Sequence, residues 1–370
     1  MTKQKRKRQV MAGVLASAIA LGGNFAMQPA PTANAGSLGS IVGTVIAGAR
    51  AHEQASQAIR ELNDTEEGRQ ALFQKYKEEY GVEYNSPYQG LCESVMTRVT
   101  QGIAASDPSV WDKPFLWFIN QNDSFNAFCS LGHVMSINRG LFNYLQNEDE
   151  IAVVIGHEMG HGMKNHVAKA AHKRINTAIL ANIAADMTDA SAIRNIALDM
   201  TVKHVNQVVI GKADEWEADG LALQYITAAG YNPGAAAAVW QRFIDQSGDN
   251  KENLASEILN PSDHPSNSAR RDKYAKSVKD YSGGHVDVKD GIVLVNGKKL
   301  VTPAAGGGMS SAERAYFVQG NLAAAYHNGH NRSEATADGN TVMLGAQPIM
   351  TSMDGDEAAS VIADRLNQIK

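Results

Sequence analysis

The stretch VIGHEMGHGMKNH, residues 154–166, constrains this chain more than any other, because it places two histidines four residues apart in an apolar, helix-forming run. Residues four apart share one face of an α-helix, so His157 and His161 can direct their imidazoles at one point. Glu158 follows His157 directly, where its carboxylate can reach a water molecule beside a metal without binding the metal. The H-E-x-x-H pattern therefore predicts a zinc site with its general base.

The residues around this pattern favour a metal site over two ordinary histidines that share a helix. The preceding run IAVVIG is apolar, and Gly156, Gly160 and Gly162 remove side chains from around the histidine pair. Each glycine destabilises a helix by about 1 kcal/mol relative to alanine. Three of them in one helix indicate that something requires close access to its backbone.

A third ligand is needed, because a catalytic zinc ion commonly takes three protein ligands and keeps one position for water. The segment GKADEWEADGLALQY, residues 211–225, offers three acidic candidates. On a helix Glu215 and Asp219 share a face, whereas Glu217 points elsewhere. We therefore expect Glu215 to bind the metal and Asp219 to hydrogen-bond the far nitrogen of a ligating histidine. Taken alone, the same segment would be an ordinary solvated helix face.

The first 35 residues have the layout of a secretory signal peptide. A basic head at residues 3–8 precedes a short apolar run at residues 10–21 and the small triplet Ala33-Asn34-Ala35. This run is too short to span a bilayer comfortably, which favours cleavage after Ala35 over a membrane anchor. The sequence thus predicts an exported protein that is periplasmic, with secretion as the alternative.

Composition narrows the partners of the mature chain. Cleavage would remove five basic residues and no acidic ones, which takes the formal charge from -5 to -10. An acidic protein of this kind is a poor match for nucleic acid, so we expect no such partner. No further segment has the eighteen apolar residues of a membrane span, although contact of residues 36–50 with a membrane stays open. Cys92 and Cys129 form either one disulfide or two buried thiols.

The rest of the chain predicts helices around a few strands. Helical composition dominates residues 41–105 and 167–245, and the latter range is broken at AAGYNPGA. Apolar runs predict a buried strand at residues 115–123 and a second strand, ending in a turn, at residues 126–142. Residues 260–274 predict a loop that leads into a short helix.

An internal echo marks the C-terminal part of the chain. VNGKKLVT at residues 295–302 resembles LGAQPIMT at residues 344–351, and a helical segment follows each. Asn296-Gly297 between apolar runs is a hairpin signal, so each copy should be a hairpin plus a helix. We expect a signal peptide at residues 1–35, a zinc metalloprotease domain at residues 36–280 and a small, internally duplicated α/β module at residues 285–370.

Several separated motifs carry a resemblance to a known family over roughly residues 70 to 275. They are NAF, NEDEIAVVIGHEMGHGMKNH, EWEADGLALQYITAAGYNP and DHPSNSARRDKY. Together they resemble the metalloproteases that include the CAAX prenyl endopeptidases, the HtpX membrane heat-shock proteases and the soluble periplasmic BepA-type proteases. The resemblance implies an α+β gluzincin fold, a mainly helical domain with a small β-sheet, holding one Zn²⁺ per chain. The C-terminal module has no counterpart in that family's protease core.

The resemblance also implies roles for individual residues. His157, His161 and Glu215 would be the ligands, Glu158 the base and Asp219 the support of a ligating histidine. His264 of the later H-P motif would lie at the active site, where it either stabilises the oxyanion or binds zinc as a fourth ligand and keeps the enzyme latent. The substrate contacts would come from Asn126, Ala127, Phe128 and Arg270.

These features predict an exported zinc-dependent endopeptidase acting on proteins or peptides, misfolded envelope proteins among them. An extended substrate would add along the strand edge at residues 126–138. The alternative is a zinc-locked binding or chaperone-like envelope factor with little proteolytic activity, for which a base such as Glu158 has no use. Four other histidines are predicted to be surface or satisfied side chains: His133, His166, His172 and His204.

Overall fold

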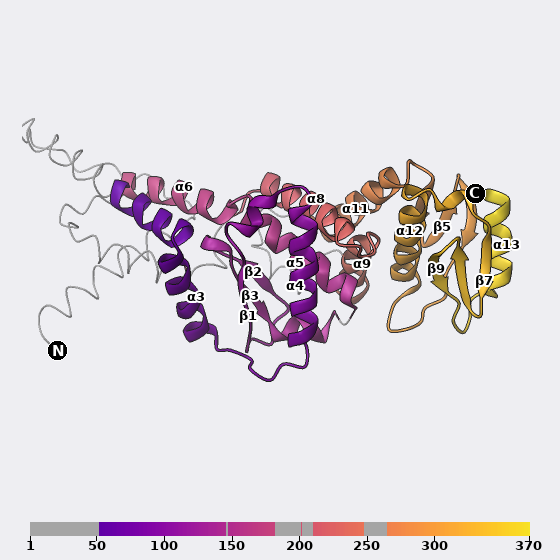
Figure 1. The fold of residues 1–370 in the computed structure, drawn as a ribbon, viewed down its shortest axis with the longest axis horizontal. Helices are drawn as coiled ribbons and strands as arrows, with labels where there is room; N and C mark the ends of the chain where they lie inside the picture. The colour runs from indigo at the N-terminus through magenta and orange to yellow at the C-terminus, as the bar shows by residue number, and fades with distance from the viewer. Residues whose placement is uncertain (1–51, 146, 182–200, 202–209, 248–264) are drawn as a thin grey trace, which may run out of the picture.

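The computed structural model describes residues 52–145, 147–181, 201, 210–247 and 265–370. The predicted signal peptide, His204 and His264 lie outside the described residues. The described part is elongated, with the helices that follow residue 52 at one end and the C-terminal strands at the other (Figure 1). In the described part of the chain, no helix combines the length and the apolar character that a membrane crossing needs.

Helices dominate the chain and small three-stranded sheets complete it, which confirms the predicted α+β class. Residues 52–64 are helical, as expected for the N-terminal part. The helices that follow, up to the C-terminal module, are α3 (Glu66–Tyr80), α4 (Gln89–Ala104), α5 (Glu148–Met163), α6 (His166–Ala181), α8 (Lys212–Ala228), α9 (Ala235–Ser247) and α11 (Asn267–Tyr281).

The first sheet has the strand order β1-β3-β2, with β1 (Leu116–Asn120) parallel and β2 (Ala127–Cys129) antiparallel to the central β3 (Val134–Asn138). The single strand predicted for residues 126–142 is therefore wrong. Gly132 and His133 have φ values of 68° and 55°, a left-handed turn that separates β2 from β3. Within residues 126–138 only β2 is an edge strand, because β3 is central, so a substrate cannot add along the whole of this range.

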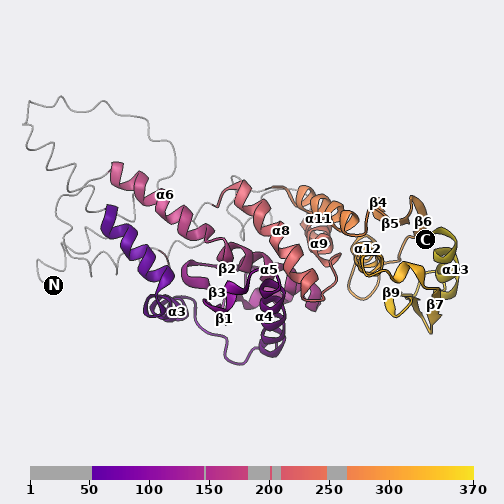
Figure 2. The ribbon, with the colours of Figure 1, turned by 45° about the horizontal axis from the view of Figure 1, so that its top comes forward.

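Helix α5 carries the H-E-x-x-H motif and begins where the sequence favours a helix start. Asn147 caps it by accepting a hydrogen bond from the Asp149 N–H, and three acidic residues occupy its first turn, where they complement the helix dipole. Helix α8 packs along α5 (Figure 2). A Cβ built on Gly160 would lie 3.4 Å from the Cα of Ala218 of α8. Small residues thus permit the close approach of the two helices.

The C-terminal module, residues 285–370, consists of two copies of one unit. Each unit is an antiparallel three-stranded meander followed by a helix, so the predicted hairpins are present and each has a third strand that was not expected. Asn296 and Gly297, both at positive φ, join the second and third strands of the first unit. The elements are β4 (Val286–Lys289), β5 (Ile292–Val295), β6 (Lys298–Val301), α12 (Ser311–His327), β7 (Ala335–Asp338), β8 (Thr341–Leu344), β9 (Gln347–Thr351) and α13 (Ala359–Ile369).

The module meets the preceding helices through α12, which packs on α9 and α11. Two glycines let the backbones touch there: a Cβ on Gly320 of α12 would lie 2.3 Å from the Gly234 nitrogen. Asn232, in the turn after α8, donates from Nδ2 to the Phe317 carbonyl of α12. Glycine and asparagine chemistry in one turn therefore fixes the junction.

A buried charge cluster strengthens the same junction. Arg242 of α9 donates to Glu150 of α5 at 3.0 Å and also bonds the carboxylate of Glu313 of α12. All three side chains are buried, so one guanidinium faces two carboxylates away from water and can balance only one negative charge. The cluster ties α5, the helix of the H-E-x-x-H motif, to the module.

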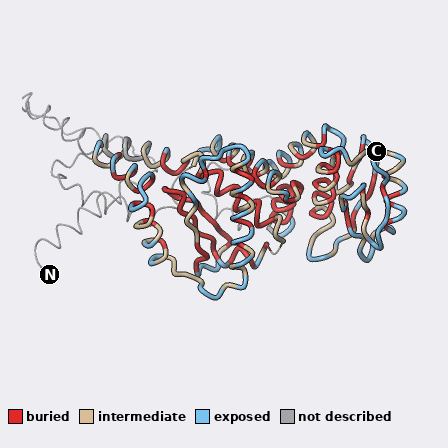
Figure 3. Tube along the Cα trace, in the orientation of Figure 1, coloured by how far each residue is buried: buried red, intermediate tan, exposed pale blue. Residues whose placement is uncertain are grey.

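Buried residues run through the interior of both parts of the molecule (Figure 3). One core forms around α4, α5 and α9, and a separate core fills the C-terminal module. Cys92 and Cys129 are both buried free thiols, so the second of the two expected cysteine states is the one present.

Candidate metal centre

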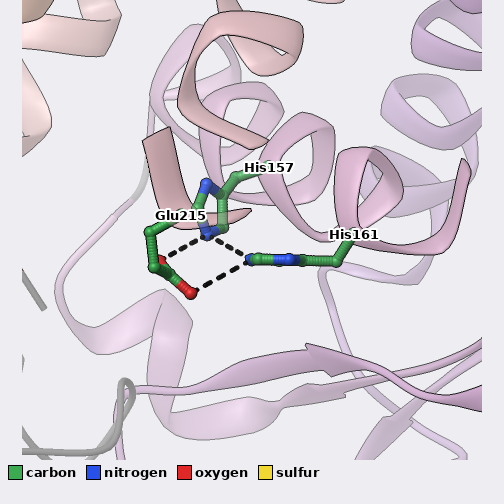
Figure 4. Close-up of side chains that lie close together, drawn as sticks. All are labelled: His157, His161 and Glu215. Atoms are coloured by element: carbon green, nitrogen blue, oxygen red, sulfur yellow. Dashed lines mark hydrogen bonds and ion pairs between the residues drawn. The ribbon is translucent and has the colours of Figure 1, made fainter. Parts of the chain in front are cut away.

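Three potential ligand atoms converge between α5 and α8. The Nε2 atoms of His157 and His161 lie 3.0 Å apart. Glu215 of α8 places one carboxylate oxygen 3.5 Å from the first of these nitrogens and the other oxygen 3.4 Å from the second (Figure 4). All three residues are buried, and the donor atoms lie within 4.8 Å of one another. The structure therefore brings together the three residues that the sequence selected as ligands.

The chemistry of this donor set fits a zinc ion. Two imidazole nitrogens and one carboxylate are a common protein ligand set for catalytic zinc. Burial, with the neighbouring His157 adding to it, holds the pKa of His161 well below its usual range, so the ring is the neutral imidazole that a metal requires. Two ring nitrogens 3.0 Å apart and facing one carboxylate form a site that a single cation can satisfy.

Glu158 lies beside this cluster, on the side of strand β2. The backbone N–H of Cys129 donates to its Oε2 at 3.0 Å. Burial raises the pKa of Glu158 to about 7, against the opposing effect of His157. A carboxylate with this pKa can accept a proton and release it again near neutral pH.

Asp219, one turn after Glu215, supports the first histidine from behind. Its Oδ1 lies 3.0 Å from Nδ1 of His157, and it also accepts hydrogen bonds from Tyr274 and from Nε of Arg270. Burial opposes ionisation, but Arg270 and His157 hold the pKa of Asp219 well below its usual range. An ionised Asp219 accepts the Nδ1 proton of His157 and leaves Nε2 free for a metal.

Arg270 was expected to contact substrate, and the structure places it among the supports of the site. Its guanidinium is buried, bonds Asp219 and stacks on the ring of Trp240 at 3.8 Å. Nη1 lies 4.0 Å from Oε2 of Glu215 and has no hydrogen-bond acceptor among the described residues. Any substrate contact by Arg270 would therefore have to come from this one nitrogen.

His166, predicted to be a surface or satisfied histidine, lies directly against the site. Its Nδ1 is 2.8 Å from Nδ1 of His161, and its Nε2 is 3.1 Å from Oε2 of Glu217. Five residues after His161 would be off the ligand face if α5 continued, but Asn165, at a φ of 53°, ends the helix. An asparagine in this conformation is a common helix terminator, so Asn165 was the available sequence signal.

Glu217 also departs from expectation in part. It does point away from the ligands, as the helix geometry predicts, but it meets His166 rather than solvent alone. The exposed fraction of its side chain is 45%. Glu215 thus lies between His157 and His161, Asp219 contacts His157 from behind, and Glu217 contacts His166.

The predicted substrate contacts on β2 differ in where they point. Ser130 N–H donates to Val134 and Asn138 N–H donates to Asn126, so the even-numbered residues bond the central strand. By alternation, the backbone groups of Ala127 and Cys129 face the open edge. Phe128 instead packs its ring against Tyr76 and Tyr80 on the far side. The Oδ1 atom of Asn126 is buried without a hydrogen-bond partner in the described part of the chain.

His133 lies outside the site and is satisfied, as the sequence predicts. Its Nδ1 lies 2.7 Å from the Lys113 carbonyl, and its ring stacks on Phe115 at 4.4 Å. Burial lowers the pKa of His133 to about 4, so the ring is neutral.

Comparison with known proteins places this geometry in a family. The model of peptidase family M48 matches residues 90–276, just over half of the 370 residues. The chain is 30% identical over 142 residues to the beta-barrel assembly-enhancing protease of Yersinia pestis, which covers 36% of this chain and 29% of that protein. It is 29% identical over 140 residues to the protein of the same name from Escherichia coli, with the same coverage.

A mitochondrial relative matches a somewhat longer stretch. The metalloendopeptidase OMA1 of Saccharomyces cerevisiae is 30% identical over 161 residues, which are 41% of this chain and 45% of that protein. The aligned parts thus span less than half of each of these relatives. The match to the family model, which contains α5 and α8, confirms the predicted class of enzyme, a metalloendopeptidase: the chain belongs to peptidase family M48.

Proposed function

We propose that this chain is an exported zinc-dependent endopeptidase that hydrolyses peptide bonds in envelope proteins, as part of their quality control. The observation that carries the proposal is the convergence of His157, His161 and Glu215 with the carboxylate of Glu158 beside them. The N-terminal sequence supports export. The name of the bacterial relatives, beta-barrel assembly-enhancing protease, supports an envelope substrate.

His157, His161 and Glu215 would hold the metal. A zinc ion supplies Lewis acidity, which polarises the scissile carbonyl and makes water acidic enough to lose a proton near neutral pH. Asp219 keeps the proton of His157 on Nδ1, and Arg270 keeps Asp219 ionised. The buried supports therefore fix the ligands before substrate arrives.

Glu158 moves the proton in this scheme. It takes a proton from water as the water oxygen bonds to the carbonyl carbon, and it passes that proton to the amide nitrogen as the C–N bond breaks. The products are a carboxylate and a free amine, so water is the only other reactant. A pKa of about 7 suits a group that must act as base and then as acid.

The open edge of β2 would hold the substrate in an extended conformation. Ala127 turns its backbone groups to that edge, where a peptide can add as a further strand. The buried Oδ1 atom of Asn126 is a second polar contact available to a peptide N–H. Phe128 would contribute through the core that supports β2, since its ring packs on Tyr76 and Tyr80.

A Glu158→Gln variant tests the proposal. The purified variant should bind zinc as the parent chain does but digest casein at least about 100-fold more slowly, because the general base is lost. A chelator should stop digestion by the parent. If the variant digests casein at the parent rate, the assignment of Glu158 is wrong. If the parent binds zinc but digests no unfolded protein, the chain is a zinc-locked binding factor instead.

Three further experiments address the parts that the sequence alone supports. Cell fractionation tests export, which predicts a mature chain that begins after Ala35. His264→Ala separates the two roles of His264: higher casein turnover identifies a latch on the metal, and lower turnover identifies help to the oxyanion. Mass-spectrometric comparison of exported proteins in cells with the parent or Glu158→Gln enzyme would reveal the substrates.

A further inference from the structure

His166 sits at the start of α6 with both ring nitrogens engaged. Its side chain is fully buried, and its ring meets that of His161 at 70°, with ring centroids 5.0 Å apart. Nδ1 faces Nδ1 of His161 at 2.8 Å, and Nε2 faces Oε2 of Glu217 at 3.1 Å. A continuous path of hydrogen-bond distances thus runs from the ligand set to a carboxylate at the surface.

The directions of these hydrogen bonds follow from proton counting. Only one proton can lie between two facing Nδ1 atoms. When His161 binds a metal through Nε2, its Nδ1 carries the proton and donates to Nδ1 of His166. A neutral His166 then carries its own proton on Nε2, where the carboxylate of Glu217 accepts it. Every nitrogen in the path has a partner of the correct kind.

We propose that His166 and Glu217 are positioning residues, which fix the orientation and the tautomer of His161 as a metal ligand. The inference rests on the proposed zinc function and deepens it. Asp219 acts on His157 directly from a buried position, whereas Glu217 acts on His161 through a second imidazole. The two ligating histidines are thereby supported in two different ways.

The same residues could instead form a second metal site, because His166, Asp214 and Glu217 also cluster. Proton counting argues against it. A metal on Nε2 of His166 would put the proton on its Nδ1, and His161 would then have to accept at Nδ1 and carry its proton on Nε2. His161 could not bind zinc in that state. Both carboxylates are also largely exposed, at 40% and 45%.

The experiment measures zinc affinity in the full chain by competition with a chromogenic chelator. His166→Leu removes the acceptor and should raise the zinc Kd about 10- to 100-fold. His166→Asn should restore most of the affinity, because its Oδ1 lies close to where Nδ1 was and can accept the same proton. Glu217→Gln tests the outer end of the path at a half-exposed position, outside the buried core, and should weaken binding several-fold. His172→Leu, on the same helix and away from the site, is the matched control.

Two readouts separate this role from a structural one. The melting temperature in EDTA should differ little between His166→Leu and His166→Asn, whereas the increase on adding zinc should be small only in the first. In the Co²⁺-loaded parent, two hyperfine-shifted, exchangeable N–H proton signals are expected from the two ligating histidines, and His166→Leu should broaden one of them.

The outcomes are distinct. A parent chain that takes up no zinc overturns the proposed function. If the parent binds zinc, and His166→Leu and Glu217→Gln bind it within twofold of the parent, only the positioning role of His166 and Glu217 is overturned. The positioning role is also wrong if His166→Asn binds zinc as weakly as His166→Leu, since the hydrogen-bond acceptor would then be irrelevant.

Discussion

Nδ1 of His157 lies 3.0 Å from Oδ1 of Asp219, and both side chains are buried. Asp219→Asn keeps the shape but removes the charge that holds the His157 proton on Nδ1. We expect the zinc Kd to rise about 10- to 100-fold. Stability in EDTA should fall by about 3 kcal/mol, because the buried Arg270 loses the carboxylate that it hydrogen-bonds and keeps only that of Glu215, 4.0 Å away. Chelator competition and urea unfolding measure the two effects, and Asp272→Asn on the exposed side of α11 is the control. An unchanged zinc Kd would contradict this role.

Metal removal should loosen the contact between α5 and α8. Zinc binds only the folded chain, because His157 and His161 meet Glu215 only when the two helices pack. Zinc at 1,000 times its Kd should therefore raise the free energy of unfolding by about 4 kcal/mol over the EDTA state. Thermal unfolding with EDTA, zinc or magnesium measures this, and magnesium should add nothing. Glu215→Ala should abolish most of the zinc effect, and a full effect in that variant would remove Glu215 from the ligand set.

The close approach of α5 and α8 can be tested with one substitution at two glycines. Gly160→Leu places a side chain against Ala218, whereas Gly220→Leu adds one where no atom lies within 4 Å. Both gain similar helix propensity, so the difference reports the packing. Gly160→Leu should lose about 1 to 3 kcal/mol of stability and bind zinc more weakly. Gly220→Leu should match or exceed the parent. The urea midpoints in EDTA measure this difference. Equal midpoints would show that the packing of α5 on α8 does not require a glycine at position 160.

Glu150 predicts a specific dependence of stability on pH. Burial raises its pKa to about 7, against the effect of Arg242, while Glu313 and Asp149 oppose ionisation. Since the pKa in the folded state lies above the ordinary glutamate value of 4.5, the contribution of Glu150 to stability is complete below about pH 4.5 and is lost as the pH rises through 7. Glu150→Gln lacks this loss. Its stability relative to the parent should therefore increase by on the order of 2 kcal/mol between pH 5 and 8.

Urea unfolding of both chains in EDTA at several pH values measures that difference. EDTA removes the separate pH dependence of metal binding. Glu78→Gln, whose side chain is 72% exposed on α3, should run parallel to the parent at every pH. A parallel curve for Glu150→Gln as well would show that Glu150 stays ionised throughout this range.

Local rules were sufficient to predict much of the site. The spacing of His157 and His161 places both rings on one face of α5, and the same rule distinguishes Glu215 and Asp219 from Glu217. Helices α5 and α8 are far apart in the sequence, and local rules do not predict that they pack together. The expected contact of Glu215 with the histidines therefore rested on the chemistry of zinc and on the family resemblance.

The features that sequence reasoning missed depend on backbone turns. His166 reaches the site because Asn165 ends α5, and β2 separates from β3 because Gly132 and His133 turn the chain. In each case one or two residues adopt a left-handed backbone conformation and interrupt the element. Hydrophobic periodicity alone predicts that the helix or strand continues there. The link from Arg242 to Glu313 joins residues 71 positions apart. No local pattern could have paired them.

At the contact between Gly234 and Gly320, the C-terminal module packs backbone against backbone on the turn that follows α8. A flexible linker would let an attached domain take many orientations, whereas close packing of backbone on backbone favours a single orientation. A partner bound by residues 285–370 would therefore lie at a fixed distance and angle from the catalytic helix. Lengthening the chain between α11 and β4 would not restore freedom, because the fixing point is the turn at Asn232.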